Sequence, residues 1–177
     1  MRIQPLELMR EVVESFIRLV KTEIHPNAVL VASDDMFEVT KTPSVVLQGP
    51  TMVEDSRRRT LAMSVTKDIP DLTYEQRNHP RLYHLDFDII VTVDTEGELL
   101  DYMEKVARFV QVNSTFQVAE HGSIGLTELT PLGGLKRVNL SNLRQASGRY
   151  RIEDCPMYDG RVITGPLVAE VQLDMNP

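Results

Sequence analysis

The clearest pattern of apolar and polar positions lies near the start of the chain. From Pro5 to about Lys21, apolar residues recur every three or four positions, and charged residues occupy much of the opposite side. Pro5 suits the first turn of a helix, because its missing N–H would have no partner there. His25-Pro26 ends the segment, since the residue before a proline is pushed out of the helical region. The pattern predicts an amphipathic helix over residues 5–21.

The best strand pattern runs from Leu82 to Val93. Apolar residues occupy every second position along it: Tyr83, Leu85, Phe87, Ile89, Val91 and Val93. The positions between them are largely polar, which is typical of an antiparallel sheet that is solvated on one face. Asp94 or Thr95 then caps a second helix, which the apolar spacing carries to about Val112.

Several weaker β-type runs complete the pattern. They cover residues 28–32, 37–41, 44–47, 60–66, 115–119, 149–152, 162–164 and 167–173. Gly49-Pro50 bounds the third of these runs. The polar segment Thr51 to Arg59 lies between the third run and the fourth, so we expect a long hairpin with Arg57, Arg58 and Arg59 at its tip.

Two stretches carry no strong pattern. Residues 67–81 are expected to be a loop, because prolines, Asp71 and Asn78 interrupt them. The stretch from His121 to Ser147 is irregular and is long for a structureless loop in a compact domain. It predicts either a short helix near residues 140–146 or a segment that orders against a partner.

Together these elements predict an α+β fold: an antiparallel or mixed sheet on which the N-terminal helix and a second helix pack, with a long hairpin and loops. The length of 177 residues fits one domain spanning residues 1–177. Its expected parts are the N-terminal helix (about 5–21), the sheet and second helix (28–119), a loop (120–148) and a C-terminal hairpin (149–175).

Composition and charge narrow the function classes. A net charge of −7 disfavours a dedicated nucleic-acid binder, whose affinity would come mainly from cationic contacts to phosphates. The single cysteine, Cys155, cannot form an internal disulfide. No apolar run approaches the roughly 18 residues that span a bilayer, and the acidic N-terminal helix does not resemble a signal peptide. We therefore expect no membrane partner.

The candidate chemistry is sparse. His84, Asp86 and Asp88 share one face of the predicted strand and offer nitrogen and oxygen ligands for a metal, but no second ligand cluster supports them, and the same residues fit a solvent-exposed face. Acidic neighbours would raise the pKa of the Cys155 thiol and make it a poor nucleophile. Gly133-Gly134 indicates a turn rather than a phosphate loop. We expect no enzyme activity and no cofactor, with a small metal-binding enzyme as an alternative.

Charge is segregated along the chain. Asp94 to Glu104 carries five acids and no base, and Leu129 to Ile152 carries five bases and no acid. These stretches are either solvated surface or complementary faces that meet between copies of the chain, the acidic helix of one against Lys136 and Arg137 of the next. The candidate interface residues are Arg57, Arg58, Arg59, Lys136, Arg137 and Arg144.

The order of elements resembles that of the tail terminator proteins of tailed phages, also called neck or tail-completion proteins. The segments most alike are residues 82–110 (LYHLDFDIIVTVDTEGELLDYMEKVARFV) and residues 148–175 (GRYRIEDCPMYDGRVITGPLVAEVQLDM). The resemblance is one of pattern over most of the chain and includes no diagnostic motif.

The resemblance implies a structural virion protein of the tail or neck, present in the host cytoplasm before assembly. Such proteins form a ring, usually of six subunits, that caps the tail tube and joins it to the head connector. The implied partners are further copies of the chain, the tail tube protein and the connector protein, with DNA passing through the lumen without sequence-specific binding. Another head–tail connector protein or a tail-tube protein is the alternative within the same class.

Overall fold

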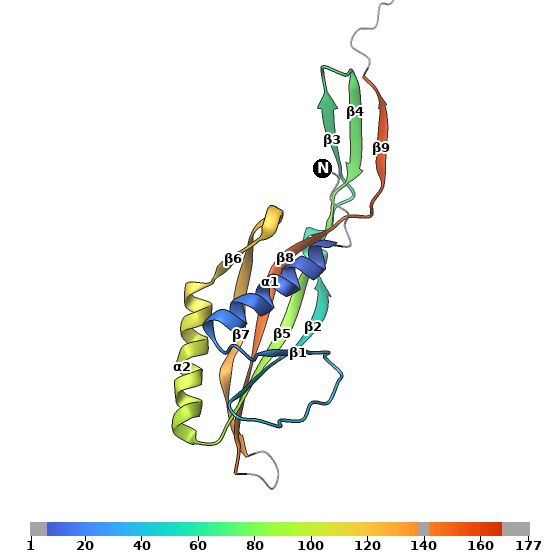
Figure 1. The fold of residues 1–177 in the computed structure, drawn as a ribbon. Coiled ribbons are helices and arrows are strands. Elements are labelled where there is room, and N and C mark those ends of the chain that lie inside the picture. Colours follow the sequence, from blue (N-terminus) through green and yellow to red (C-terminus); the bar gives the residue numbers. More distant parts are fainter. Residues whose placement is uncertain (1–6, 138–141, 168–177) are drawn as a thin grey trace, which may run out of the picture.

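The computed structural model describes residues 7–137 and 142–167, which form two sheets and two α-helices (Figure 1). In chain order the elements are α1 (Glu7–Glu23), β1 (Val29–Val31), β2 (Ser44–Glu54), the 3₁₀ turn η1 (Ser56–Arg58), β3 (Met63–Asp68), β4 (Thr73–Asn78), β5 (Arg81–Val93), α2 (Glu96–Val112), β6 (Thr115–Val118), the 3₁₀ turn η2 (Ala119–His121), β7 (Gly122–Arg137), β8 (Arg144–Met157) and β9 (Val162–Pro166). The predicted α+β class is confirmed.

The larger sheet has the strand order β1-β2-β5-β8-β7-β6 and forms, with both helices, what we call the body. Among the described strands, only β1 and β2 pair in parallel. The smaller sheet, β3-β4-β9, forms what we call the arm, which projects beyond one end of the body (Figure 1).

The core of the body lies between one face of its sheet and the two helices. From α1, apolar side chains at helical spacing are buried: Leu8, Val12, Phe16, Val20 and Ile24. The ring centroid of Phe16 lies 5.1 Å from that of Phe87 on β5 and 6.4 Å from that of Phe109 on α2. The predicted N-terminal helix is therefore confirmed. Its apolar side chains pack against both the sheet and the second helix.

The predicted second helix is confirmed with its cap. Thr95 accepts a hydrogen bond from the backbone N–H of Glu98, and the Glu98 side chain accepts one from the backbone N–H of Thr95, each over 3.3 Å. This reciprocal pair satisfies two N–H groups that the first helical turn leaves without partners. Leu99, Val106 and Phe109 face the core.

The predicted strand at residues 82–93 is also confirmed, as β5. Leu85, Phe87, Ile89, Val91 and Val93 are buried on the core side. β5 pairs with β2 on one side and β8 on the other, so it lies inside the sheet.

The strand predicted at residues 44–47 continues as β2 through Gly49-Pro50, which were expected to end it. An irregularity in register between Gln48 and Thr51 accommodates these two residues. Gly49 has φ of +144°, and a Cβ there would lie 2.8 Å from the Asp86 carbonyl oxygen, so the position requires glycine. The strand predicted at residues 37–41 is wrong, because that segment has no strand structure.

The long hairpin and the loop at residues 67–81 are also wrong. β2 pairs with β5 in the body, whereas β3 pairs with β4 in the arm, so the two strands around Arg57–Arg59 are not partners. Residues 73–78 form β4. β4 has no buried residue, so its sequence lacks the alternation that marks a half-buried strand.

The loop predicted at residues 120–148 is wrong, because β7 and β8 occupy most of it. β7 shows three irregularities in its register with β8, and such bulges break the alternating pattern. The short helix near residues 140–146 is wrong from Arg144 on, where β8 begins, and residues 138–141 lie outside the described residues.

The C-terminal hairpin at residues 149–175 is wrong as well. β8 pairs with β5 and β7 in the body, and β9 pairs with β4 in the arm. The strand expected at residues 167–173 lies, apart from Leu167, outside the described residues. No helix of the described ranges has the length and apolar character needed to cross a membrane.

Candidate functional site

The three predicted interface arginines lie where the chain leaves the body for the arm. Arg57 and Arg58 belong to the turn η1 and Arg59 follows it, so none of them is at a hairpin tip. Asp55 caps this turn, because its carboxylate accepts a hydrogen bond from the backbone N–H of Arg57 over 3.2 Å. The turn therefore places the three residues beside the base of the arm.

The three arginines have different surroundings. Arg58 Nε donates to Asp55 over 2.8 Å, and its guanidinium also pairs with Asp154 on β8. The hydrogen bond from Arg58 holds the pKa of Asp55 below its usual value. Arg59 Nε lies 3.9 Å from Glu54 Oε1. Arg57 is exposed and has no ion pair among the described residues. Arg58 therefore ties the turn to the body, whereas Arg57 faces solvent.

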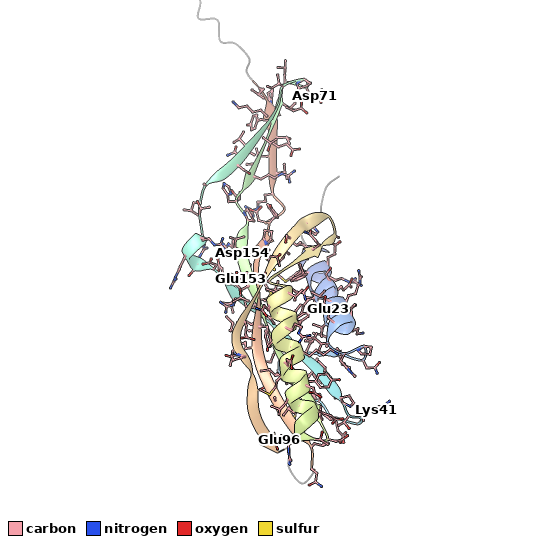
Figure 2. The ribbon with its side chains drawn as sticks, turned by 90° about the vertical axis from the view of Figure 1, so that its left-hand side faces the viewer. Glu23, Lys41, Asp71, Glu96, Glu153 and Asp154 are labelled. Carbon is pink, nitrogen blue, oxygen red and sulfur yellow. The ribbon has the colours of Figure 1, made fainter. Side chains whose placement is uncertain are left out.

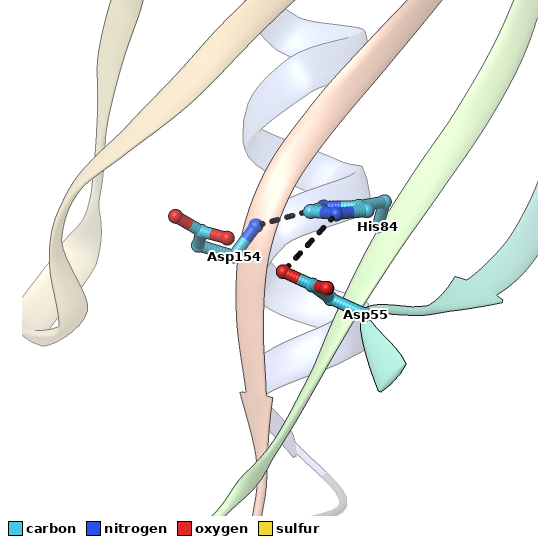
Figure 3. Close-up of side chains that lie close together, drawn as sticks. All are labelled: Asp55, His84 and Asp154. Atoms are coloured by element: carbon cyan, nitrogen blue, oxygen red, sulfur yellow. Dashed lines mark hydrogen bonds and ion pairs between the residues drawn. The ribbon is translucent and has the colours of Figure 1, made fainter. Parts of the chain in front are cut away.

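His84 lies between the two aspartates that bind Arg58 (Figure 3). Its Nδ1 accepts a hydrogen bond from the backbone N–H of Asp154 over 3.3 Å, and its Nε2 lies 4.0 Å from Asp55 Oδ2. Asp154 has φ of +59° and belongs to a bulge opposite His84. An imidazole and two carboxylates are ligands that fit a zinc-type ion, but here the Arg58 guanidinium already binds both carboxylates.

The predicted trio of His84, Asp86 and Asp88 shares one face of β5, but its side chains have separate partners. Asp86 accepts two hydrogen bonds from Arg151 over 2.7 and 2.8 Å, and Asp88 accepts two from Arg149 over 2.8 and 3.1 Å. Each pair joins residues directly opposite each other on β5 and β8. These hydrogen bonds raise the pKa of both arginines. The geometry favours the solvent-face interpretation of this trio over the metal-site one.

Cys155 is buried in the body. Burial raises the pKa of its thiol to about 11, so the predicted direction is confirmed. The expected cause was wrong, because desolvation rather than the neighbouring acids produces the shift. A thiol held in this protonated form does not act as a nucleophile.

The remaining interface candidates belong to the hairpin of β7 and β8. Lys136 pairs in register with Gln145, and Arg137 with Arg144. Arg144 is also opposite Val93 on β5, one residue before Asp94. The basic end of this hairpin and the acidic start of α2, marked by Glu96 in Figure 2, therefore occupy the same end of one subunit. The proposed meeting of these charges across copies stays a prediction.

One surface was not predicted from the sequence: the apolar face of the arm. Strand register places Met63, Val65, Tyr74 and Ile163 on the same side of the arm. Met63 and Val65 already stood out in the run at residues 60–66. The face could not be predicted without β4, because β4 lies between β3 and β9 and brings them together. Its sequence, Thr-Tyr-Glu-Gln-Arg-Asn, has almost no apolar residues that would mark it as a strand.

Comparison with known proteins defines the class of this fold. No protein-family model matches the chain, and no curated protein matches it in sequence. Among solved structures, the fold is shared with a protein that terminates a tubular assembly.

That structure is the sheath/tube terminator of an extracellular contractile injection system, PVC, in its extended state. The TM-score is 0.60 with 14% sequence identity, over 96% of this chain and 63% of that one. This chain thus spans a little under two thirds of that terminator. A chain from the virion of a native gene transfer agent particle has a TM-score of 0.42, with 15% identity over 83% of this chain and 90% of its own, a similarity too weak to define a shared fold. The predicted resemblance to a tail terminator is confirmed at the level of the fold.

Proposed function

We propose that this protein is a tail terminator: a structural virion subunit that forms a ring, caps the tail tube and joins it to the head connector. The observation that carries the proposal is the fold shared with a sheath/tube terminator over 96% of the chain. The role is structural, with neither catalysis nor a cofactor. The protein acts in the tail or neck of the virion and is present in the host cytoplasm before assembly.

The proposed partners are copies of the chain in a six-membered ring, the tail tube protein and the head-connector protein. DNA passes through the lumen without base-specific contacts. The net charge of −7 supports this role in two ways. Like charges keep free subunits apart in solution, and they weaken non-specific attachment of DNA.

The interface candidates differ in their surroundings, which supports different roles for them. Arg57 is exposed and lacks an ion pair among the described residues, so it is available to a partner. The Arg58 side chain binds Asp55 and Asp154 and so stabilises the base of the arm. We propose Arg57 and the basic end of the β7–β8 hairpin, including Lys136, Arg137 and Arg144, as docking residues.

Negative-stain electron microscopy of the purified protein, concentrated and with magnesium present, tests the ring. We expect discrete rings with an open channel. Long tubes would instead identify a tail-tube protein, and subunits that stay monomeric at every concentration would contradict the ring.

A matched pair of variants tests the division between the arginines. Arg57→Glu should keep the wild-type melting temperature and impair ring assembly or docking. Arg58→Glu should lower the melting temperature, because it places a third acid beside Asp55 and Asp154. Equal melting temperatures for the two variants would contradict the division.

A further inference from the structure

The arm exposes an apolar face that nothing in the described chain covers. Met63, Val65 and Ile163 lie on this face with 49%, 53% and 54% of their surface exposed, and Tyr74 lies on the strand between theirs. The same face also carries two uncharged polar residues, Gln76 between Val65 and Ile163 and Asn78 opposite Met63. Lys67, directly opposite Tyr74, is the one charged residue among the strand positions of this face. We call this set the arm face.

The other side of the arm is mainly polar. Its strand positions include Ser64, Thr66, Glu75, Arg77 and Thr164. One apolar and one polar face are typical of a sheet that packs against something, and a small sheet without a covered face is marginal in water. Both helices of the described chain lie against the body (Figure 1), so no described helix covers the arm.

A second set of exposed apolar residues lies along the free edge of the body sheet. β1 pairs with β2 only at Val46 to Gln48, so no strand of the described ranges lies beside residues 51–54 of β2 on that side. Val29, Leu30, Met52 and Val53 are exposed there, between 37% and 54%. Strand register places Leu30 and Met52 on the core side of the sheet and Val29 and Val53 on its outer side, so they flank the edge from both faces.

Two acids belong to the same edge. The Gln48 side-chain amide donates hydrogen bonds to the carbonyl oxygens of Ser33 and Asp35 over 3.2 and 3.1 Å, which holds residues 33–35 beside β2. Asp34 and Asp35 are exposed. We call the set of Val29, Leu30, Asp34, Asp35, Met52 and Val53 the β1–β2 edge.

We propose that the arm face of one copy packs on the β1–β2 edge of the next copy, with Lys67 facing Asp34 and Asp35. Both surfaces combine exposed apolar side chains with charge, and their charges have opposite sign. They lie in different regions of one chain, so the contact repeats from head to tail and closes into a ring where the rotation allows. The inference rests on the proposed ring and names the surface that holds it together.

The size of the arm face sets the strength of this contact. β9 has five residues; five residues on each of three strands, at about 3.3 Å per residue and about 4.8 Å between strands, give a face of roughly 240 Å² in projection. A typical stable interface buries about 800 Å² on each partner. A single contact is therefore weak, and the ring should form only as protein concentration rises.

The first test disrupts the apolar part of the contact. Val65→Glu with Ile163→Glu places two carboxylates on the arm face, whereas Ser64→Glu with Val162→Glu places two on the opposite face, beside Arg77. Sedimentation velocity and electron microscopy should show rings lost in the first variant and kept in the control. Rings that survive the first variant would overturn the inference and leave the proposed function standing.

The second test exchanges the charges and does not depend on the apolar variants folding. Lys67→Glu alone, or Asp34→Lys with Asp35→Lys, should lower the association constant about two- to fivefold, the range of an exposed ion pair. Combining all three substitutions should restore it. About 1 M salt should erase the differences, because it screens exposed charges. Additive losses without recovery would overturn the proposed pairing.

Other occupants of the arm face give different results. A tail-tube protein bound there would leave rings of the Val65→Glu, Ile163→Glu variant intact and would abolish their attachment to tails, which contradicts contact between copies. Wild-type protein that stays monomeric would contradict both the ring and this inference.

Discussion

The body and the arm are both built on antiparallel strand pairs, yet only the body has a core. On β5 the side chains of Leu85, Ile89 and Val91 are fully buried, whereas no described residue in the strands of the arm is buried. The difference lies in the helices, since α1 and α2 supply the second apolar layer that the arm lacks. Hydrogen-bonded strands alone leave a sheet marginal, and its stability comes from the layer packed on it.

The largest expected difference between the two regions is the cost of losing an apolar side chain. Phe16→Ala removes a fully buried ring and should lower the free energy of unfolding by about 3–5 kcal/mol. Val65→Ala on the arm should change it by less than about 0.5 kcal/mol. Urea denaturation of both variants measures the difference, and similar costs would show that the arm has a core of its own.

The next largest expected difference is in the reactivity of a thiol in the body and a thiol in the arm. The Cys155 pKa of about 11 leaves roughly one thiolate in a thousand at pH 8, against about a quarter for a free cysteine. Alkylation of the folded protein should therefore be at least about 200-fold slower than after unfolding in guanidinium. Its rate should rise about tenfold per pH unit up to the thiol pKa. Val65→Cys on the arm should react like a free thiol, and fast labelling of Cys155 would contradict the burial.

Two glycines give a smaller contrast. A Cβ at Gly148 in the body would lie 2.8 Å from the Leu132 backbone nitrogen, and a Cβ at Gly165 in the arm would lie 2.7 Å from the Tyr74 ring. Gly148→Ala should cost about 1–3 kcal/mol, because backbone on the neighbouring strand must shift. Gly165→Ala should leave the melting temperature unchanged and speed hydrogen exchange in β9 alone. If both variants lowered the melting temperature in one cooperative transition, body and arm would unfold together.

The smallest expected effects come from the ion pairs on the outer face of the body. The Asp86 side chain is 13% exposed and the Asp88 side chain 33% exposed. Asp86→Asn should cost about 1 kcal/mol, and Asp88→Asn a few tenths, because solvent screens the second pair more. Double-mutant cycles with Arg151 and Arg149 measure each pair. Equal coupling energies would contradict the ranking by exposure.

The elements that were predicted well from the sequence all belong to the body. The helices at residues 5–21 and after Asp94, and the strand at residues 82–93, each have one face in the core, which imposes a period on the sequence. β7 and β8 also contribute side chains to the core. In β7, however, bulges near Thr130 and Gly133 interrupt the alternation of apolar and polar residues, so the pattern does not stand out in the sequence. β4 has no buried face, so nothing in residues 73–78 distinguishes it from a loop.

The site was harder to predict than the fold because its geometry depends on distant residues. Arg57, Arg58 and Arg59 were recognised as a group, but only tertiary structure shows that Asp154 binds one of them. Likewise, Asp86 and Asp88 were placed on the correct face, while their arginine partners lie more than sixty residues away in the sequence. Charge patterns predict which surfaces are polar, and strand register decides which charges meet.

The attachment of the arm has a mechanical consequence. The chain passes between body and arm after β2, between β4 and β5, and between β8 and β9, and β5 and β8 are neighbours inside the body sheet. β2, β5 and β8 all meet the arm at the same end, so a pull on the arm draws these three strands together and loads the hydrogen bonds between β8 and its other neighbour, β7, in shear, where many bonds resist at once. Tension applied at the arm is therefore transmitted directly to strands inside the body sheet.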